Sequence, residues 1–227
     1  MDNPEDQIAE VIHNLTARSR KDQQQALREY FLPNAYFIHP FSRVPSFSTF
    51  KVPYTNQIVN SRRLVSLIYQ WYRILSPEIK VEIDSICFDE KHCLLYATMR
   101  QTFTIWIVPF SLWQANVKLV TVLELQRLPV DQQNRPILNG RPGSDNDDLT
   151  LSKQLTKRYF IKGQEDHYQV EEFLKFIAPW GASLLWVAWQ LYATFICAVG
   201  VFLCRKPMVV VRERILGLDS SAVKKEQ

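Results

Sequence analysis

The sequence lacks most of the features that would assign it to a common functional class. Its 227 residues include only 6 glycines and 4 cysteines, and the formal net charge of +4 is spread along the chain without a dense basic run. A nucleic-acid-binding surface needs clustered Lys and Arg, so this charge pattern argues against nucleic acid as a partner. The opening residues, MDNPEDQIAE, are acidic and have no apolar centre, so we expect no secretory signal there.

The four cysteines indicate neither a disulfide framework nor a metal site. Cys197 and Cys204 belong to an apolar run, whereas Cys87 and Cys93 flank a predicted hairpin turn. His92 stands beside Cys93, but no second Cys/His pair occurs at the spacing of a zinc site. We therefore expect reduced thiols in a cytosolic domain, with no metal and no cofactor.

One long stretch near the C-terminal end carries no formal charge. It runs from Phe176 to Cys204, and its densest part is about the 20 residues that an α-helix needs to cross a bilayer. Aromatic residues gather at its start, and Arg205 with Lys206 follows its end, as is common at membrane interfaces. A helix of a soluble core usually shows a polar stripe, which is almost absent here. We predict a membrane segment at 179–204 and a short basic and polar tail at 205–227.

Two observations disagree about how this segment enters the membrane. A domain that no signal peptide precedes should fold in the cytosol and be anchored by its C-terminal end. The Lys/Arg excess that normally marks the cytosolic side follows the segment, however, and a re-entrant hairpin would satisfy both observations. The length favours one tilted span over two. We expect a single span, with residues 1–178 facing the cytosol at the endoplasmic reticulum or another lipid-associated membrane.

The first 178 residues alternate between two kinds of periodicity. Apolar residues at helical spacing predict helices at 4–18, 21–30, 61–75 and 170–177. Strict alternation predicts strands at 79–88, 93–108, 117–127 and 155–164, and a short earlier strand ends at His39–Pro40. Residues 42–60 are expected to be irregular. The stretch 128–149 is rich in Pro, Gly, Asn and Asp, which predicts an exposed, mobile connection. The fold class is α+β, in one domain.

This order of elements, together with three short motifs, resembles the NTF2-like superfamily, which includes SnoaL-like and ketosteroid-isomerase-like proteins. The motifs are YFLPNA at 30–35, YFIHP at 36–40 and QEDHY at 164–168. The resemblance covers roughly residues 5–178, and it is most evident with fungal SigF-like members, which join such a domain to a C-terminal hydrophobic segment. It implies a cone in which a curved antiparallel sheet wraps round helices and encloses a pocket.

The resemblance also implies candidates for chemistry. Enzymes of this superfamily place an Asp, Glu or His base inside the cone, beside Tyr or acid donors. The candidate bases in this sequence are His13, His39, Glu82, Asp84 and Glu124. Glu82 and Asp84 lie on the polar side of their strand and are expected to face water, whereas Glu124 fits either side. Arg100 is expected to form an ion pair on the sheet surface.

Apolar and aromatic residues of the same segments predict the wall of a pocket. The predicted lining residues are Tyr36, His39, Leu67, Trp71, Tyr96 and Trp106. Because no acid–histidine pair matches an active member, we favour a noncatalytic pocket for an apolar or lipidic small molecule, held beside lipid by the anchor. Two alternatives stay open, since this fold hosts many functions. They are an isomerase or dehydratase that uses a pocket His or carboxylate, and a protein-interaction adaptor or homodimer that uses the outer sheet face.

Overall fold

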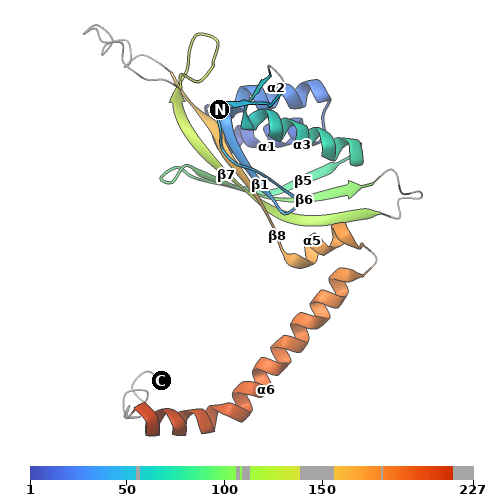
Figure 1. Cartoon of the computed structure of the whole chain (residues 1–227), viewed down its shortest axis with the longest axis vertical. Coiled ribbons are helices and arrows are strands. Elements are labelled where there is room, and N and C mark those ends of the chain that lie inside the picture. The colour runs from blue at the N-terminus through green and yellow to red at the C-terminus, as the bar shows by residue number, and fades with distance from the viewer. Residues whose placement is uncertain (55–56, 106–107, 109–112, 139–155, 180, 217–227) are drawn as a thin grey trace.

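A curved sheet holds three helices against its concave face in the computed structural model of the chain (Figure 1). The structure describes residues 1–54, 57–105, 108, 113–138, 156–179 and 181–216, with side chains described as far as residue 199. This arrangement of helices over a mainly antiparallel sheet is the α+β cone that the sequence predicts.

The three helices are α1 (Pro4–Thr16), α2 (Arg20–Tyr30) and α3 (Ser61–Leu75). Pro4 opens α1 at a position where no helical N–H partner is lost, and four apolar residues at helical spacing, from Ile8 to Leu15, are buried. Ser19 and Asp22 form a reciprocal capping box at the start of α2. The side chain of Asn60 accepts a hydrogen bond from the Arg63 N–H at 3.0 Å and so caps α3.

Six strands form the main sheet in the order β2-β1-β8-β7-β6-β5. They are β1 (Phe31–His39), β2 (Ser42–Val44), β5 (Lys80–Asp89), β6 (Leu94–Thr104), β7 (Gln114–Pro129) and β8 (Lys157–Tyr168). All neighbouring pairs are antiparallel except β1 with β8, which is parallel. The alternation of buried and exposed residues along β7 places one apolar set on the concave side, against the helices.

The structure corrects the prediction for residues 42–60. This stretch contains β2 and also a separate two-stranded hairpin of β3 (Phe50–Lys51) and β4 (Ile58–Val59). Such short strands leave no alternation to detect, which is why the sequence suggested irregular structure. The second half of the predicted mobile connection at 128–149, residues 139–149, lies outside the described residues. Its start is ordered, because β7 extends to Pro129 and Val130 bridges Pro136.

Two further helices follow the sheet. The first is α5 (Val170–Ile177), which contacts β7, and the second is α6 (Ala182–Leu216), which extends away from the domain (Figure 1). Within α6, the segment Ala182–Val199 has a mean hydropathy of 1.6 and is not buried against the rest of the chain. By length and composition it is the one helix in the described part of the chain that can cross a membrane. This segment is part of one continuous helix, Ala182–Leu216. A single span needs such a helix, whereas a re-entrant hairpin needs a break in it.

Candidate ligand cavity

A cavity of about 360 Å³ lies between the concave face of the sheet and helices α1 and α3. Most of its wall is aliphatic or aromatic, with residues such as Ile8, Val11, Leu15, Phe37, Met99 and Leu119. These side chains come from one stripe of α1 and from the inward positions of β1, β6 and β7. The volume and the apolar wall are typical of a site for a small molecule.

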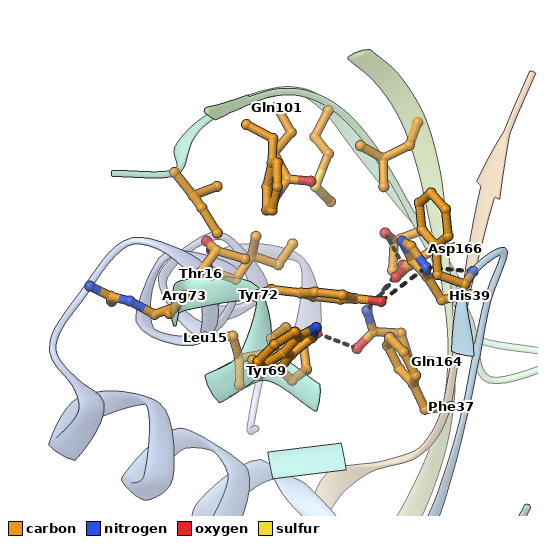
Figure 2. A pocket seen from close by; sticks show the side chains of 18 of the residues that line it. Leu15, Thr16, Phe37, His39, Tyr69, Tyr72, Arg73, Gln101, Gln164 and Asp166 are labelled. Carbon is orange, nitrogen blue, oxygen red and sulfur yellow. Dashed lines mark hydrogen bonds between the residues drawn. The ribbon is translucent and has the colours of Figure 1, made fainter. Parts of the chain in front are cut away.

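One group of polar side chains lies at one end of the cavity, around Asp166 of β8, whereas Thr16, Arg73 and Gln101 line other parts of its wall (Figure 2). The Asp166 Oδ1 atom accepts hydrogen bonds from the Thr121 hydroxyl at 2.7 Å and from the Gln164 side-chain amide at 3.0 Å. The same amide lies 3.2 Å from Oδ2, and it is oriented by the Tyr69 hydroxyl, which donates to Gln164 Oε1 at 2.8 Å. This chain of bonds fixes the carboxyl group, while Oδ2 keeps acceptor capacity for a further donor in the cavity.

His39 stands at the same end, enclosed by aromatic rings. The backbone N–H of Phe41 donates to His39 Nδ1 at 3.2 Å, so we assign the ring proton to Nε2, which lies 3.3 Å from the Tyr168 hydroxyl. The Tyr72 hydroxyl makes two hydrogen bonds. One joins it to His39 Nδ1 and the other to the Ser42 hydroxyl, each at 3.1 Å. His39 is thus part of the cavity wall, and its hydrogen bonds favour the tautomer that carries the proton on Nε2.

Burial changes the protonation of these groups. It lowers the pKa of His39 from 6.5 to about 4, so the imidazole is neutral at pH 7. It raises the pKa of Asp166 above its ordinary value, although the bonds from Gln164 and Thr121 partly offset that effect. Burial also raises the pKa of the Tyr69 and Tyr168 hydroxyls, which therefore remain proton donors. The polar end thus combines a carboxyl group that holds its proton more tightly than usual with neutral donors.

Only part of the predicted pocket wall lies on this cavity. His39 and Trp71 line it, whereas Tyr36, Leu67 and Tyr96 do not. Tyr36 and Tyr96 alternate with the buried residues of β1 and β6, so they point to the outer face of the sheet. Leu67 lies off the buried stripe of α3 and is 54% exposed. Trp106 lies outside the described residues.

The predicted bases also lie elsewhere, with the exception of His39. Glu82 and Asp84 face outward on β5, where the Arg100 guanidinium contacts them at 3.5 and 2.8 Å, as expected of a surface ion pair. Glu124 is on the outer face, bound to the Lys162 ammonium at 2.6 Å. His13 does not line the cavity. Within the described part of the chain, no group of three or more His, Cys, Asp or Glu side chains is placed to hold a metal ion.

Asp166 is the functional candidate that the sequence did not single out. Its strand runs QEDHY without clear alternation, so nothing local says which of its acids faces inward. The structure shows the phase of the strand through Gln164, a polar residue that is buried on the inward side of β8. Asp166 shares that phase, two residues further on.

The fold and its enclosed cavity define an α+β cone of the NTF2-like class. The sequence matches the SigF NTF2-like domain family over residues 1–133 and 148–206, which is most of the chain. The chain therefore belongs to this family. The match extends through α5 and into α6. A search of curated proteins finds no significant relative.

Several solved structures are similar to this chain at low sequence identity. A protein from Shewanella putrefaciens CN-32, described as a SnoaL-like polyketide cyclase, is 13% identical, with 78% of this chain and 86% of that chain covered and a TM-score of 0.44. A similarly described protein from Jannaschia sp. CCS1 is also 13% identical, covering 78% and 96%, with a TM-score of 0.43. A ketosteroid isomerase-like protein from Catenulispora acidiphila DSM 44928, in complex with trimethylamine, is 10% identical, covering 73% and 86%, with a TM-score of 0.41.

Proposed function

We propose that this protein binds an apolar or lipidic small molecule in the cone cavity and that α6 anchors it in a membrane. The observation that carries the proposal is the cavity of about 360 Å³, with an apolar wall and polar groups at one end. Such a site favours an apolar body, whose burial supplies binding energy, with one polar group for orientation. The protein acts as a noncatalytic binder in this proposal.

The polar end suggests the chemistry of the ligand's polar group. Asp166 Oδ2 can accept a hydrogen bond, or donate one when the carboxyl is protonated, and the neighbouring Tyr168 hydroxyl can also donate. Asp166 and the neutral His39 offer no fixed positive charge at this end, and the Arg73 guanidinium lines the cavity away from them. A hydroxyl or carbonyl group fits these partners better than a phosphate or a carboxylate.

The anchor would keep the binding domain at the surface of a membrane. The support is the length and apolar composition of Ala182–Val199, together with the Arg205–Lys206 pair that follows the uncharged stretch. A cytosolic position of the domain, at the endoplasmic reticulum or another lipid-associated membrane, is part of the proposal. A homodimer through the outer face of the sheet is compatible with it, because the cavity opens elsewhere.

Mass spectrometry of extracts from gently purified full-length protein tests ligand binding. We expect one class of apolar molecule at near-stoichiometric amount, and we expect the Met99→Trp variant to lose it, because Met99 lines the cavity and the larger side chain fills it. Thr98→Trp is the matched control, since Thr98 precedes Met99 on β6 and points to the other face. Equal ligand content in both variants, or no ligand in the unmodified protein, would contradict the proposal.

One observation favours a second candidate function, proton transfer. Asp166 is a carboxyl group with a raised pKa at the wall of a largely apolar cavity, a setting that suits a general base. In this alternative, Asp166 removes a proton from the carbon next to a ligand carbonyl and returns it at another carbon. A neighbouring hydroxyl such as that of Tyr168 hydrogen-bonds the enolate oxygen.

Deuterium exchange separates the two candidates. The extracted ligand is returned to the protein in D₂O, and its mass is followed. A proton-transfer enzyme would incorporate deuterium at carbon, and Asp166→Asn would abolish the incorporation while Asp84→Asn, at the surface ion pair, would not. A ligand that stays unlabelled supports the noncatalytic binder.

A further inference from the structure

Large apolar side chains remain exposed around the opening of the cavity. Phe41 and Trp71 both line the cavity, and they are 52% and 55% exposed. Ile177, at the end of α5, is 49% exposed, directly after Phe176, which also lines the cavity. We call these four residues the mouth rim. A cluster of this kind on a soluble surface usually marks an interaction site.

The end of α5 supplies two residues of the mouth rim, Phe176 and Ile177, and the helix is held on the domain by several contacts. The Phe41 ring lies 4.9 Å from the ring of Phe173 and 5.9 Å from that of Phe176, measured between centroids. The Trp113 indole N–H donates to the Phe176 carbonyl at 2.9 Å. A Glu172 carboxylate oxygen accepts from the Lys118 N–H at 2.9 Å. These contacts hold the end of α5 at the mouth of the cavity.

The chain between α5 and α6 is short. Phe176 is followed six residues later by Ala182, where the apolar helix α6 begins. Even a fully extended chain of six residues spans only about 20 Å. The first turns of α6 expose Leu184 and Leu185, at 73% and 77%. If α6 crosses a bilayer, Phe176 at the mouth of the cavity therefore lies within about 20 Å of the start of that helix.

Gly181 directly precedes α6. Its φ of +136° is a conformation that residues with a side chain rarely adopt, and no atom lies within 4 Å of the position of an added Cβ. A glycine therefore suits the backbone at the start of α6, where the surroundings are open.

We propose that the mouth rim rests on the bilayer, so that the cavity opens into the headgroup region and not into water. The proposal rests on the anchor in the proposed function, but not on ligand binding. Aromatic side chains such as Trp71 and Phe41 favour the interface between headgroups and acyl chains. An apolar ligand would then pass between cavity and membrane without crossing water.

A fluorescence experiment on the full-length protein in phosphatidylcholine vesicles tests the docking. The native cysteines are replaced by Ser, and Ile74→Cys or Ile58→Cys carries an environment-sensitive dye. Both positions are similarly exposed, at 57% and 59%, but Ile74 follows Trp71 by one turn of α3 and Ile58 precedes the helix. The rise of α3 places Ile74 about 20 Å from Ser61 at the start of the helix, and Ile58 precedes Ser61 by three residues. We expect lipid-attached nitroxide to quench the dye at position 74 at least about twofold more than at position 58.

Two controls make the result decisive. Resistance to carbonate extraction reports the anchor, and the Phe41→Glu/Trp71→Glu double variant should remain resistant while quenching at position 74 falls to the level at position 58. Equal quenching at both positions in a carbonate-resistant protein would overturn the docking and leave the anchor intact. A second copy of the chain that covers the rim and shields position 74 would overturn the docking in the same way. Release by carbonate would overturn the anchor, and the docking with it.

Discussion

The ring of Tyr36 lies directly over Gly163, its partner in the parallel pairing of β1 with β8. A Cβ at position 163 would overlap the ring, so glycine is required by a close approach and not by an unusual backbone angle. From this position the Tyr36 hydroxyl donates to Glu124 Oε2 at 3.0 Å. The contact lies where the pairing of β8 with both of its neighbours shifts register, and it stabilises that irregularity on the outer face of the sheet.

Gly163→Ala should destabilise the domain by about 1–3 kcal/mol, because the new methyl group forces the Tyr36 ring out of place. Chemical denaturation of the purified protein measures the change. Tyr36→Ala in the same chain should recover part of the loss, since it removes the clash. A double variant no more stable than Gly163→Ala alone would show that the strand backbone, and not the ring, opposes the methyl group.

His39 should make the fold less stable in mild acid. Its folded-state pKa of about 4 lies below the ordinary 6.5, so the unfolded chain binds the proton first as the pH falls. Stability attributable to His39 is complete above pH 6.5 and declines towards pH 4, by about 1–2 kcal/mol between pH 7 and pH 5. His39→Phe should flatten this part of the profile, although it also costs stability by leaving the Tyr72 hydroxyl without its nitrogen partner. An unchanged slope would contradict a buried neutral imidazole.

Asp166→Asn should stabilise the protein at pH 7. Because burial raises the pKa of Asp166, the unfolded chain releases this proton at lower pH than the folded one, which costs stability as the pH rises through the folded-state value. Asparagine carries no such cost, and its oxygen still accepts from Thr121 and Gln164, although the longer bond of 3.2 Å from Gln164 to Oδ2 is lost. The gain should shrink towards pH 4. A variant less stable at every pH would instead indicate that the fold needs the ionised carboxylate.

Protease treatment of intact microsomes tests the predicted orientation. If residues 1–178 face the cytosol, the domain is digested without detergent, and a tag at the C-terminal end survives until detergent is added. A domain that survives until detergent is added would place it on the luminal side. Digestion of both ends would favour the hairpin over the single span.

Much of the architecture was predictable because it is encoded in neighbouring residues. The helices α3 and α5 have the bounds that apolar spacing indicated, and β5 to β8 appear where alternation placed them, each differing by a few residues at its ends. The apolar segment that became α6 was equally plain, since its length and its lack of charge are properties of one continuous stretch.

The composition of the cavity wall was not predictable in the same way. The direction in which a strand residue points depends on the register with its neighbours, and a bulge reverses it. Alternation on β5 changes phase at the irregularity between Ile83 and Ser85, and β8 is shifted against β7 between Glu124 and Leu125. Tyr36 and Tyr96 were assigned to the pocket but lie on the outer face, because their immediate neighbours on β1 and β6 take the buried positions.

The sequence by itself determined the α+β order, the apolar C-terminal helix and the place of His39 at the end of its strand. Only the tertiary structure decided that Asp166 faces the cavity, because its hydrogen-bond network joins Thr121, Gln164 and Tyr69 from three elements far apart in the chain. Local sequence cannot report such contacts. The shift in pKa that makes Asp166 a functional candidate arises from burial, which exists only once those elements have packed together.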